Sequence, residues 1–109
     1  MKNRVETISH ILDTHKAESI EAFDLKNQDY FVDYVIIASS LGTRHTEALL
    51  DHLKKELKPQ ETFLGVDVSD EWIVIDLGDI LIHIMTPEYR IKYDMESFLN
   101  SLMTSSKNN

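Results

Sequence analysis

The sequence contains no cysteine. This absence excludes disulfide bonds, iron–sulfur clusters and thiol catalysis, because each of them requires a cysteine sulfur. No apolar run approaches the roughly 20 residues that a membrane-spanning helix needs. The first eight residues also lack the continuous apolar segment of a secretory signal. We therefore expect a cytoplasmic protein that has no membrane partner.

Basic residues are scarce as well. The chain has 11 lysines and arginines against 19 aspartates and glutamates, for a formal net charge of -8. A free-standing nucleic-acid-binding domain usually carries a cationic surface that displaces counterions from the phosphates. We therefore expect no direct nucleic-acid binding. An acidic surface suits encounter with a basic protein, because complementary fields speed association, but it also serves solubility alone.

The length of 109 residues suffices for one domain with one core. We assign residues 1–103 to this domain and expect residues 104–109 to form a disordered polar tail. Apolar spacing predicts helices over 3–16 and 43–58, strands over 19–25 and 30–38, and a connector with a short strand over 63–69. Further helix starts are expected at Thr86-Pro87 and at Asp94. This order predicts an α+β fold, a mixed β-sheet flanked by helices.

The most distinctive segment is residues 71–85, which predicts two strands joined by a turn around Gly78. Side chains alternate between the faces of a strand, so the pairing register decides which residues share a face. One face of the hairpin is apolar throughout: Ile73, Ile75, Leu77, Ile80, Ile82 and Ile84. The other carries Trp72, Val74, Asp76, Leu81, His83 and Met85. The first face predicts a core, and the second fits either a second packed layer or a docking surface for another chain.

Two residues of the second face have open roles. Trp72 is the only tryptophan, a residue type that is enriched among interface anchors but is also common in cores. We expect His83 to be buried and structural, with an interface contact as the next interpretation.

Four aspartates lie near the hairpin in the sequence: Asp67, Asp70, Asp76 and Asp79. Clustered carboxylates can hold magnesium for phosphoryl or nucleotidyl transfer. However, Asp76 and Asp79 flank a turn rather than project together from one strand. Aspartate beside glycine is also favoured in turns for conformational reasons. We therefore prefer the turn interpretation and keep the metal site as the alternative.

The other polar groups form no recognised catalytic pattern. The turn at 39–43 precedes a helix, where phosphate can bind, but it has one glycine and lacks both a Walker lysine and a Gly-x-Gly-x-x-Gly pattern. The five histidines show no metal-ligand spacing. No serine or threonine has an identifiable base and orienting acid. We expect no enzymatic activity, no metal and no cofactor.

Residues 16–99 resemble the Iojap family, also called ribosomal silencing factors. The resemblance is carried above all by Trp72, the Asp-Leu-Gly-Asp turn at 76–79, His83, Arg90 and Tyr93. Matches at 16–20, at 33–38, at Arg44 and at Glu96 extend it. Two positions depart from the family pattern: Leu99 stands where a tryptophan usually closes the final helix, and Thr43 replaces a serine.

The resemblance implies a nucleotidyltransferase-like fold without the catalytic acidic pair and glycine-serine motif of those enzymes. It also implies a homodimer or monomer that binds protein fourteen of the large ribosomal subunit. Bound there, the protein would block joining of the small subunit and repress translation under nutrient limitation. The implied partner-binding residues are Trp72, Asp76, Leu77, Asp79, Leu81, His83, Met85, Arg90 and Tyr93.

We assign distinct roles within this set. Trp72 is expected to anchor the contact, and Asp76 and Asp79 to pair with basic side chains of the partner. Arg90 and Tyr93 are expected to support the surface from behind.

Two alternatives remain at this point. One is a nucleotidyltransferase-like, metal-dependent enzyme that uses Asp67, Asp70, Asp76 and Asp79. The other is a dimeric scaffold that self-associates through the second hairpin face and has no ribosome site there.

Overall fold

The computed structural model describes residues 3–58 and 60–107. The elements follow the chain in this order: α1 (Arg4–Thr14), β1 (Glu18–Asp24), β2 (Tyr34–Ser39), α2 (Thr43–Leu57), β3 (Gly65–Val68), β4 (Trp72–Asp76), β5 (Ile80–Met85), α3 (Pro87–Tyr93) and α4 (Met95–Lys107). Within these residues, no helix combines the length and the apolar character needed to cross a bilayer.

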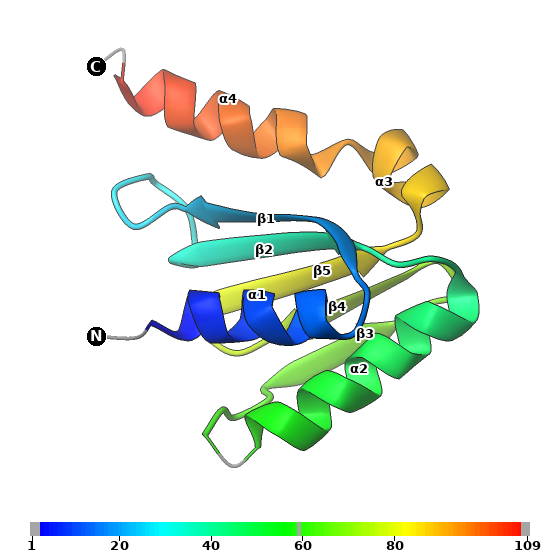
Figure 1. Cartoon of the computed structure of the whole chain (residues 1–109). Helices are drawn as coiled ribbons and strands as arrows, with labels where there is room; N and C mark the ends of the chain where they lie inside the picture. Colours follow the sequence, from blue (N-terminus) through cyan, green and yellow to red (C-terminus); the bar gives the residue numbers. More distant parts are fainter. Residues whose placement is uncertain (1–2, 59, 108–109) are drawn as a thin grey trace.

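The five strands form one sheet in the order β1-β2-β5-β4-β3. The β2–β5 pair is parallel, and the β1–β2, β3–β4 and β4–β5 pairs are antiparallel. Figure 1 shows the helices packed around this sheet, with α4 along its β1 side and α2 beside β3. The predicted α+β class, a mixed sheet flanked by helices, is confirmed.

The β4–β5 hairpin has the predicted register, with Trp72 opposite Met85, Val74 opposite His83 and Asp76 opposite Leu81. The turn requires a positive φ at Gly78, which is +99°. A Cβ at this position would also lie 3.2 Å from the Cδ1 atom of Leu64, so the turn admits a side chain poorly. The two sets of hairpin side chains therefore face opposite sides of the sheet, as the alternation predicts.

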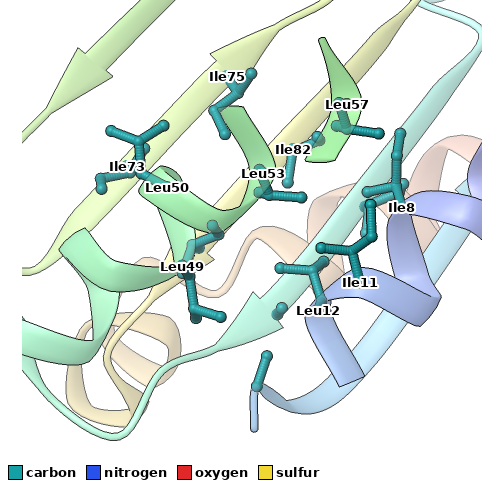
Figure 2. Close-up of a cluster of buried hydrophobic side chains, with 14 of the residues drawn as sticks. Ile8, Ile11, Leu12, Leu49, Leu50, Leu53, Leu57, Ile73, Ile75 and Ile82 are labelled. Atoms are coloured by element: carbon teal, nitrogen blue, oxygen red, sulfur yellow. The ribbon is translucent and has the colours of Figure 1, made fainter. Parts of the chain in front are cut away.

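The first hairpin face lies in the main core. Helices α1 and α2 cover it with apolar stripes, and Figure 2 shows these side chains meeting those of β4 and β5. The helical contributors include Ile8, Ile11, Leu12, Leu49, Leu50, Leu53 and Leu57, all buried. This burial explains why both helices have the i, i+3, i+4 apolar spacing seen in the sequence.

The other side of the sheet carries a second, smaller core. Met95 and Leu99 of α4 pack there with apolar residues of β1, β2 and β5. Leu99 is fully buried, so the leucine at this position closes the helix against the sheet. Trp72 and Val74 of β4 lie at the margin of this core and are half-buried.

Helices α3 and α4 begin where the sequence predicts. The Thr86 side chain caps α3 by accepting from the Tyr89 amide at 3.3 Å, and Pro87 occupies the first turn. Asp94 adopts a left-handed conformation that separates the two helices. Helix α4 continues to Lys107, so residues 104–107, which the sequence assigns to a disordered tail, are helical; residues 108–109 lie outside the described residues.

Candidate docking surface

The second hairpin face and α3 enclose a small pocket of about 80 Å³. Six residues line it: Trp72, Val74, His83, Met85, Tyr89 and Tyr93. We call it the aromatic pocket. It lies on the sheet side opposite α1 and α2, at the margin of the second core.

Three aromatic rings form the wall of the aromatic pocket. The ring centroids of Trp72 and Tyr89 are 6.2 Å apart, and those of Tyr89 and Tyr93 are 5.5 Å apart and stacked. Tyr93 is 55% exposed, whereas Trp72 and Tyr89 are half-buried. Aromatic rings that are partly packed and partly open combine rigid apolar area with access to a partner.

His83 lies inside the aromatic pocket, on β5. It is 6% exposed, and its Nε2 atom has no hydrogen-bond partner among the described residues. Burial lowers the pKa of His83 to about 4, because desolvation penalises the charged imidazolium. His83 is therefore neutral at pH 7, and its unpaired Nε2 atom is buried rather than open to solvent.

Arg90 fixes the helix that carries the two tyrosines. Its buried guanidinium donates to the Ser19 carbonyl oxygen at 2.7 Å and to Ser39 Oγ at 2.9 Å. It also bonds to Glu96 Oε2, at 2.8 Å from Nη2, and to Glu21 Oε2 at 3.4 Å. These contacts tie α3 to β1, β2 and α4, so Arg90 acts behind the aromatic pocket rather than at its surface.

The hairpin tip carries Asp76 and Asp79, the two aspartates among the predicted partner-binding residues. Asp76 Oδ1 accepts from the Gly78 amide at 2.8 Å, which is the local turn bond expected for this residue. Asp79 is held by a bidentate pair with Arg4 of α1, at 2.6 and 2.9 Å. Its hydrogen bonds from Arg4 lower the pKa of the Asp79 carboxyl. Arg4 also bonds to Glu61, at 2.7 and 2.8 Å.

The predicted partner-binding residues thus fall into different environments. Trp72, His83, Met85 and Tyr93 meet at the aromatic pocket, although Met85 is almost fully buried. Leu81 is buried in the second core. Leu77 is buried in the main core, on the opposite face from the pocket. The buried leucines can shape the surface only from beneath.

Tyr89 belongs to the pocket and was not among the predicted residues. The signal for it lies in the sequence: once α3 begins at Pro87, Tyr89 and Tyr93 are four residues apart and share one helix face.

The alternative metal site does not form at the four aspartates. Asp70 precedes β4 and Asp76 ends it, so the length of a five-residue strand, roughly 15 Å, separates them. Asp67 pairs with Val74 in the middle of the β3–β4 ladder. In the described part of the chain, no three of these carboxylates bring their oxygens together.

The turn after β2 uses its polar groups internally. The Ser40 and Thr46 hydroxyls are 2.6 Å apart and buried, and one of them donates to the other. Both oxygens also lie within hydrogen-bond distance of the Gly42 carbonyl oxygen, at 3.2 and 2.8 Å. The Leu41 amide donates to His45 Nδ1 at 2.8 Å. These hydrogen bonds occupy the polar groups of the turn within the turn itself and the start of α2.

Comparison with known proteins gives a consistent result. The chain matches the family described as "Ribosomal silencing factor during starvation" over residues 1–108. It is 35% identical over 96 residues to ribosomal silencing factor RsfS of Haemophilus influenzae, a match that covers 84% of this chain and 93% of that protein.

Two further relatives extend the comparison. The mouse protein named "Mitochondrial assembly of ribosomal large subunit protein 1" is 29% identical over 99 residues, but the match spans only 43% of that longer protein. A crystal structure of a Chromobacterium violaceum protein superposes with a TM-score of 0.80 and 26% identity, and covers 90% of this chain and 88% of that one.

Proposed function

This chain belongs to the family of ribosomal silencing factors, and we propose that it represses translation by binding the large ribosomal subunit through that subunit's fourteenth protein. Family membership indicates a regulatory, ribosome-associated role in translation rather than catalysis. The bound protein acts by occlusion: it covers the surface that the small subunit must approach, so the two subunits do not join. The starvation context in the family's description supports action under nutrient limitation.

The observation that carries the proposal is the aromatic pocket. A partner side chain that enters it meets the rings of Trp72 and Tyr93. His83 belongs to the same lining, although its Nε2 atom is buried. An apolar stem fits this lining. Buried aromatic anchors of this kind dominate the binding energy of many interfaces.

Charge supports the choice of a basic partner. The chain carries a net charge of -8, and exposed carboxylates of Asp67 and Asp70 lie on β3 and the following turn, beside the strand that carries Trp72. Such a surface attracts cationic protein segments and speeds their encounter. Asp76, at the other end of that strand, remains a candidate for pairing with a partner's lysine or arginine.

The test is binding of the purified chain to separated large and small ribosomal subunits, followed by a subunit-joining assay. We expect binding to the large subunit only, and loss of joining when the protein is present. Trp72→Ala removes the anchor, and loss of an interface anchor commonly costs about 2 kcal/mol or more, roughly thirtyfold in affinity.

Ile91→Ala is the matched control, because Ile91 lies on α3 with 81% of its side chain exposed but does not line the aromatic pocket. It should bind normally. The thermal unfolding midpoint of each variant separates a lost contact from a lost fold. Normal large-subunit binding by a folded Trp72→Ala protein would contradict the anchor role.

A dimer that uses the same face is the competing arrangement. Sedimentation of the wild-type chain and of Trp72→Ala distinguishes the two. If Trp72→Ala changes the oligomeric state while large-subunit binding is absent from both proteins, self-association is the function of this face.

A further inference from the structure

A cluster of metal-ligating side chains lies far from the aromatic pocket, where the end of α1 meets α2. We propose that His15, His52 and Glu56 form a binding site for a divalent transition metal of the zinc type. His15 follows α1 as its C-cap residue, whereas His52 and Glu56 belong to α2. The ligand atoms of these three residues all lie within 4.8 Å of one another.

His15 already contacts each of the other two side chains. The His15 Nε2 and Glu56 Oε2 atoms are 2.5 Å apart. The rings of His15 and His52 stack with a centroid distance of 3.5 Å and an interplanar angle of 9°. His52 and Glu56 are one helical turn apart, so both project from the same face of α2. Imidazole lone pairs lie in the plane of the ring. To bind one ion, the two rings must therefore leave their parallel stack, and the ion must replace the direct His15–Glu56 contact.

A fourth residue positions this cluster without joining it. His45 Nε2 lies 2.8 Å from the His15 carbonyl oxygen, and His45 Nδ1 accepts from the Leu41 amide. A carbonyl can only accept, so Nε2 carries the proton and His45 is held in one neutral tautomer. His45 therefore fixes the backbone of His15 against α2, while both of its own nitrogens are occupied.

The donor set selects the class of metal. Two imidazoles and one carboxylate, with a water to complete the tetrahedron, are ligands typical of Zn²⁺. Imidazole nitrogen favours zinc, copper and nickel, whereas magnesium and calcium prefer sites built from oxygen alone. Bound here, the ion would join α1 to α2 and stiffen the helical layer that covers the main core.

The spacing rules used on the sequence do not reveal this site. His52 and Glu56 have a helical i, i+4 relation, but the third ligand, His15, precedes His52 by 37 positions in the sequence. Only the packing of α1 on α2 brings it close.

The experiment is titration of the untagged full-length chain with Zn²⁺ by calorimetry, because a histidine tag would itself bind the metal. We expect one ion per chain and a higher thermal unfolding midpoint in its presence. His52→Gln and Glu56→Gln should each weaken binding by at least about tenfold, since even the outer partners of metal ligands have effects of that size. Mg²⁺ should give no comparable binding.

His10→Gln is the matched control, because His10 is an exposed histidine of α1 outside the cluster. It should leave Zn²⁺ affinity unchanged. Thermal unfolding without added metal establishes that each variant folds. The proposal is wrong if wild type, His52→Gln and Glu56→Gln bind Zn²⁺ alike, because the ion would then sit on other groups, or if the folded wild type binds none.

Discussion

The two faces of the β4–β5 hairpin are built from the same alternating sequence, but they differ in how deeply their side chains are buried. Every residue of the first face is buried beneath α1 and α2. On the second face, Leu81, His83 and Met85 of β5 are buried, whereas Trp72, Val74 and Asp76 of β4 are half-buried. The buried strand residues of the cluster that contains Met95 and Leu99 of α4 come from β1, β2 and β5, and Trp72 and Val74 of β4 pack at its margin. Strand β4 thus lies at the limit of the helical cover, and that is where the aromatic pocket forms.

The difference shows how one sheet can have one face fully covered while the other keeps an accessible margin. The first face is sealed by two helices whose apolar stripes match it, so its side chains contribute to folding alone. The second face is sealed on one half only, and α3 supplies tyrosines rather than aliphatic side chains at the boundary. An accessible apolar strip of this kind is a candidate contact surface.

The largest expected effect comes from two neighbours on β4. Ile75→Ala opens a cavity in the main core, where Ile75 has no exposed surface, and should lower the free energy of unfolding by about 2–5 kcal/mol. Val74→Ala, on the opposite face of the same strand, should cost less, because Val74 is half-buried and its neighbours and solvent can fill the space. Urea denaturation measures both. Equal losses would mean that the second face is sealed as tightly as the first.

Much of this division could be predicted from the sequence. The hairpin register follows from the alternation and from the turn at Gly78, because a strand's side-chain period is fixed at two. The start of α3 follows from Thr86 and Pro87 for equally local reasons. Both predictions depend on residues that lie close together in the chain.

What the sequence could not supply depends on distant packing. The pair between Arg4 and Asp79 joins residues 75 positions apart, and Arg90 meets Ser19 across 71 positions. No pattern fixes where α4 stops covering the sheet, so the exposure of Trp72 was undetermined. For the same reason Leu81 and Met85, which alternation places with Trp72, proved to be buried.

The pH dependence of stability probes how dry the aromatic pocket is. The folded-state pKa of His83 is about 4, below the unfolded value of about 6.5. The unfolded chain therefore binds a proton that the folded chain rejects, and stability is lost as pH falls from about 6.5 towards 4. At pH 5 this loss amounts to about 2 kcal/mol.

Urea unfolding at pH 7.5 and pH 5 tests this expectation in wild type and in His83→Leu, which has no titrating group at this position. Other groups titrate in both proteins, so the quantity of interest is the difference between their losses. Wild type should lose about 2 kcal/mol more than the variant. Parallel losses would show that water reaches His83 and that the second face is open down to β5.

Two exposed aromatic residues test whether the aromatic pocket, rather than exposed apolar surface in general, contacts the ribosome. Tyr93 is 55% exposed and Phe98 is 51% exposed, but only Tyr93 lines the pocket. Tyr93→Ala should weaken large-subunit binding by about 1 kcal/mol, roughly fivefold. Phe98→Ala should have no effect. Co-sedimentation at several protein concentrations measures both, and equal weakening would argue for a diffuse apolar contact.

The smallest effect concerns the hairpin tip, where the two faces meet. Asp79→Asn weakens the pair with Arg4 and leaves the Arg4–Glu61 pair in place. It should cost less than about 1 kcal/mol of stability, because the side chains of Arg4 and Asp79 are both 45% exposed and solvent screens them. The loss should shrink further at high salt. If Asp79 also docks on the ribosome, Asp79→Asn weakens large-subunit binding while Arg4→Gln, which leaves the carboxylate free, preserves it. If neither variant alters binding, Asp79 serves to hold α1 at the tip, and the docking surface is confined to the aromatic pocket and the strand beside it.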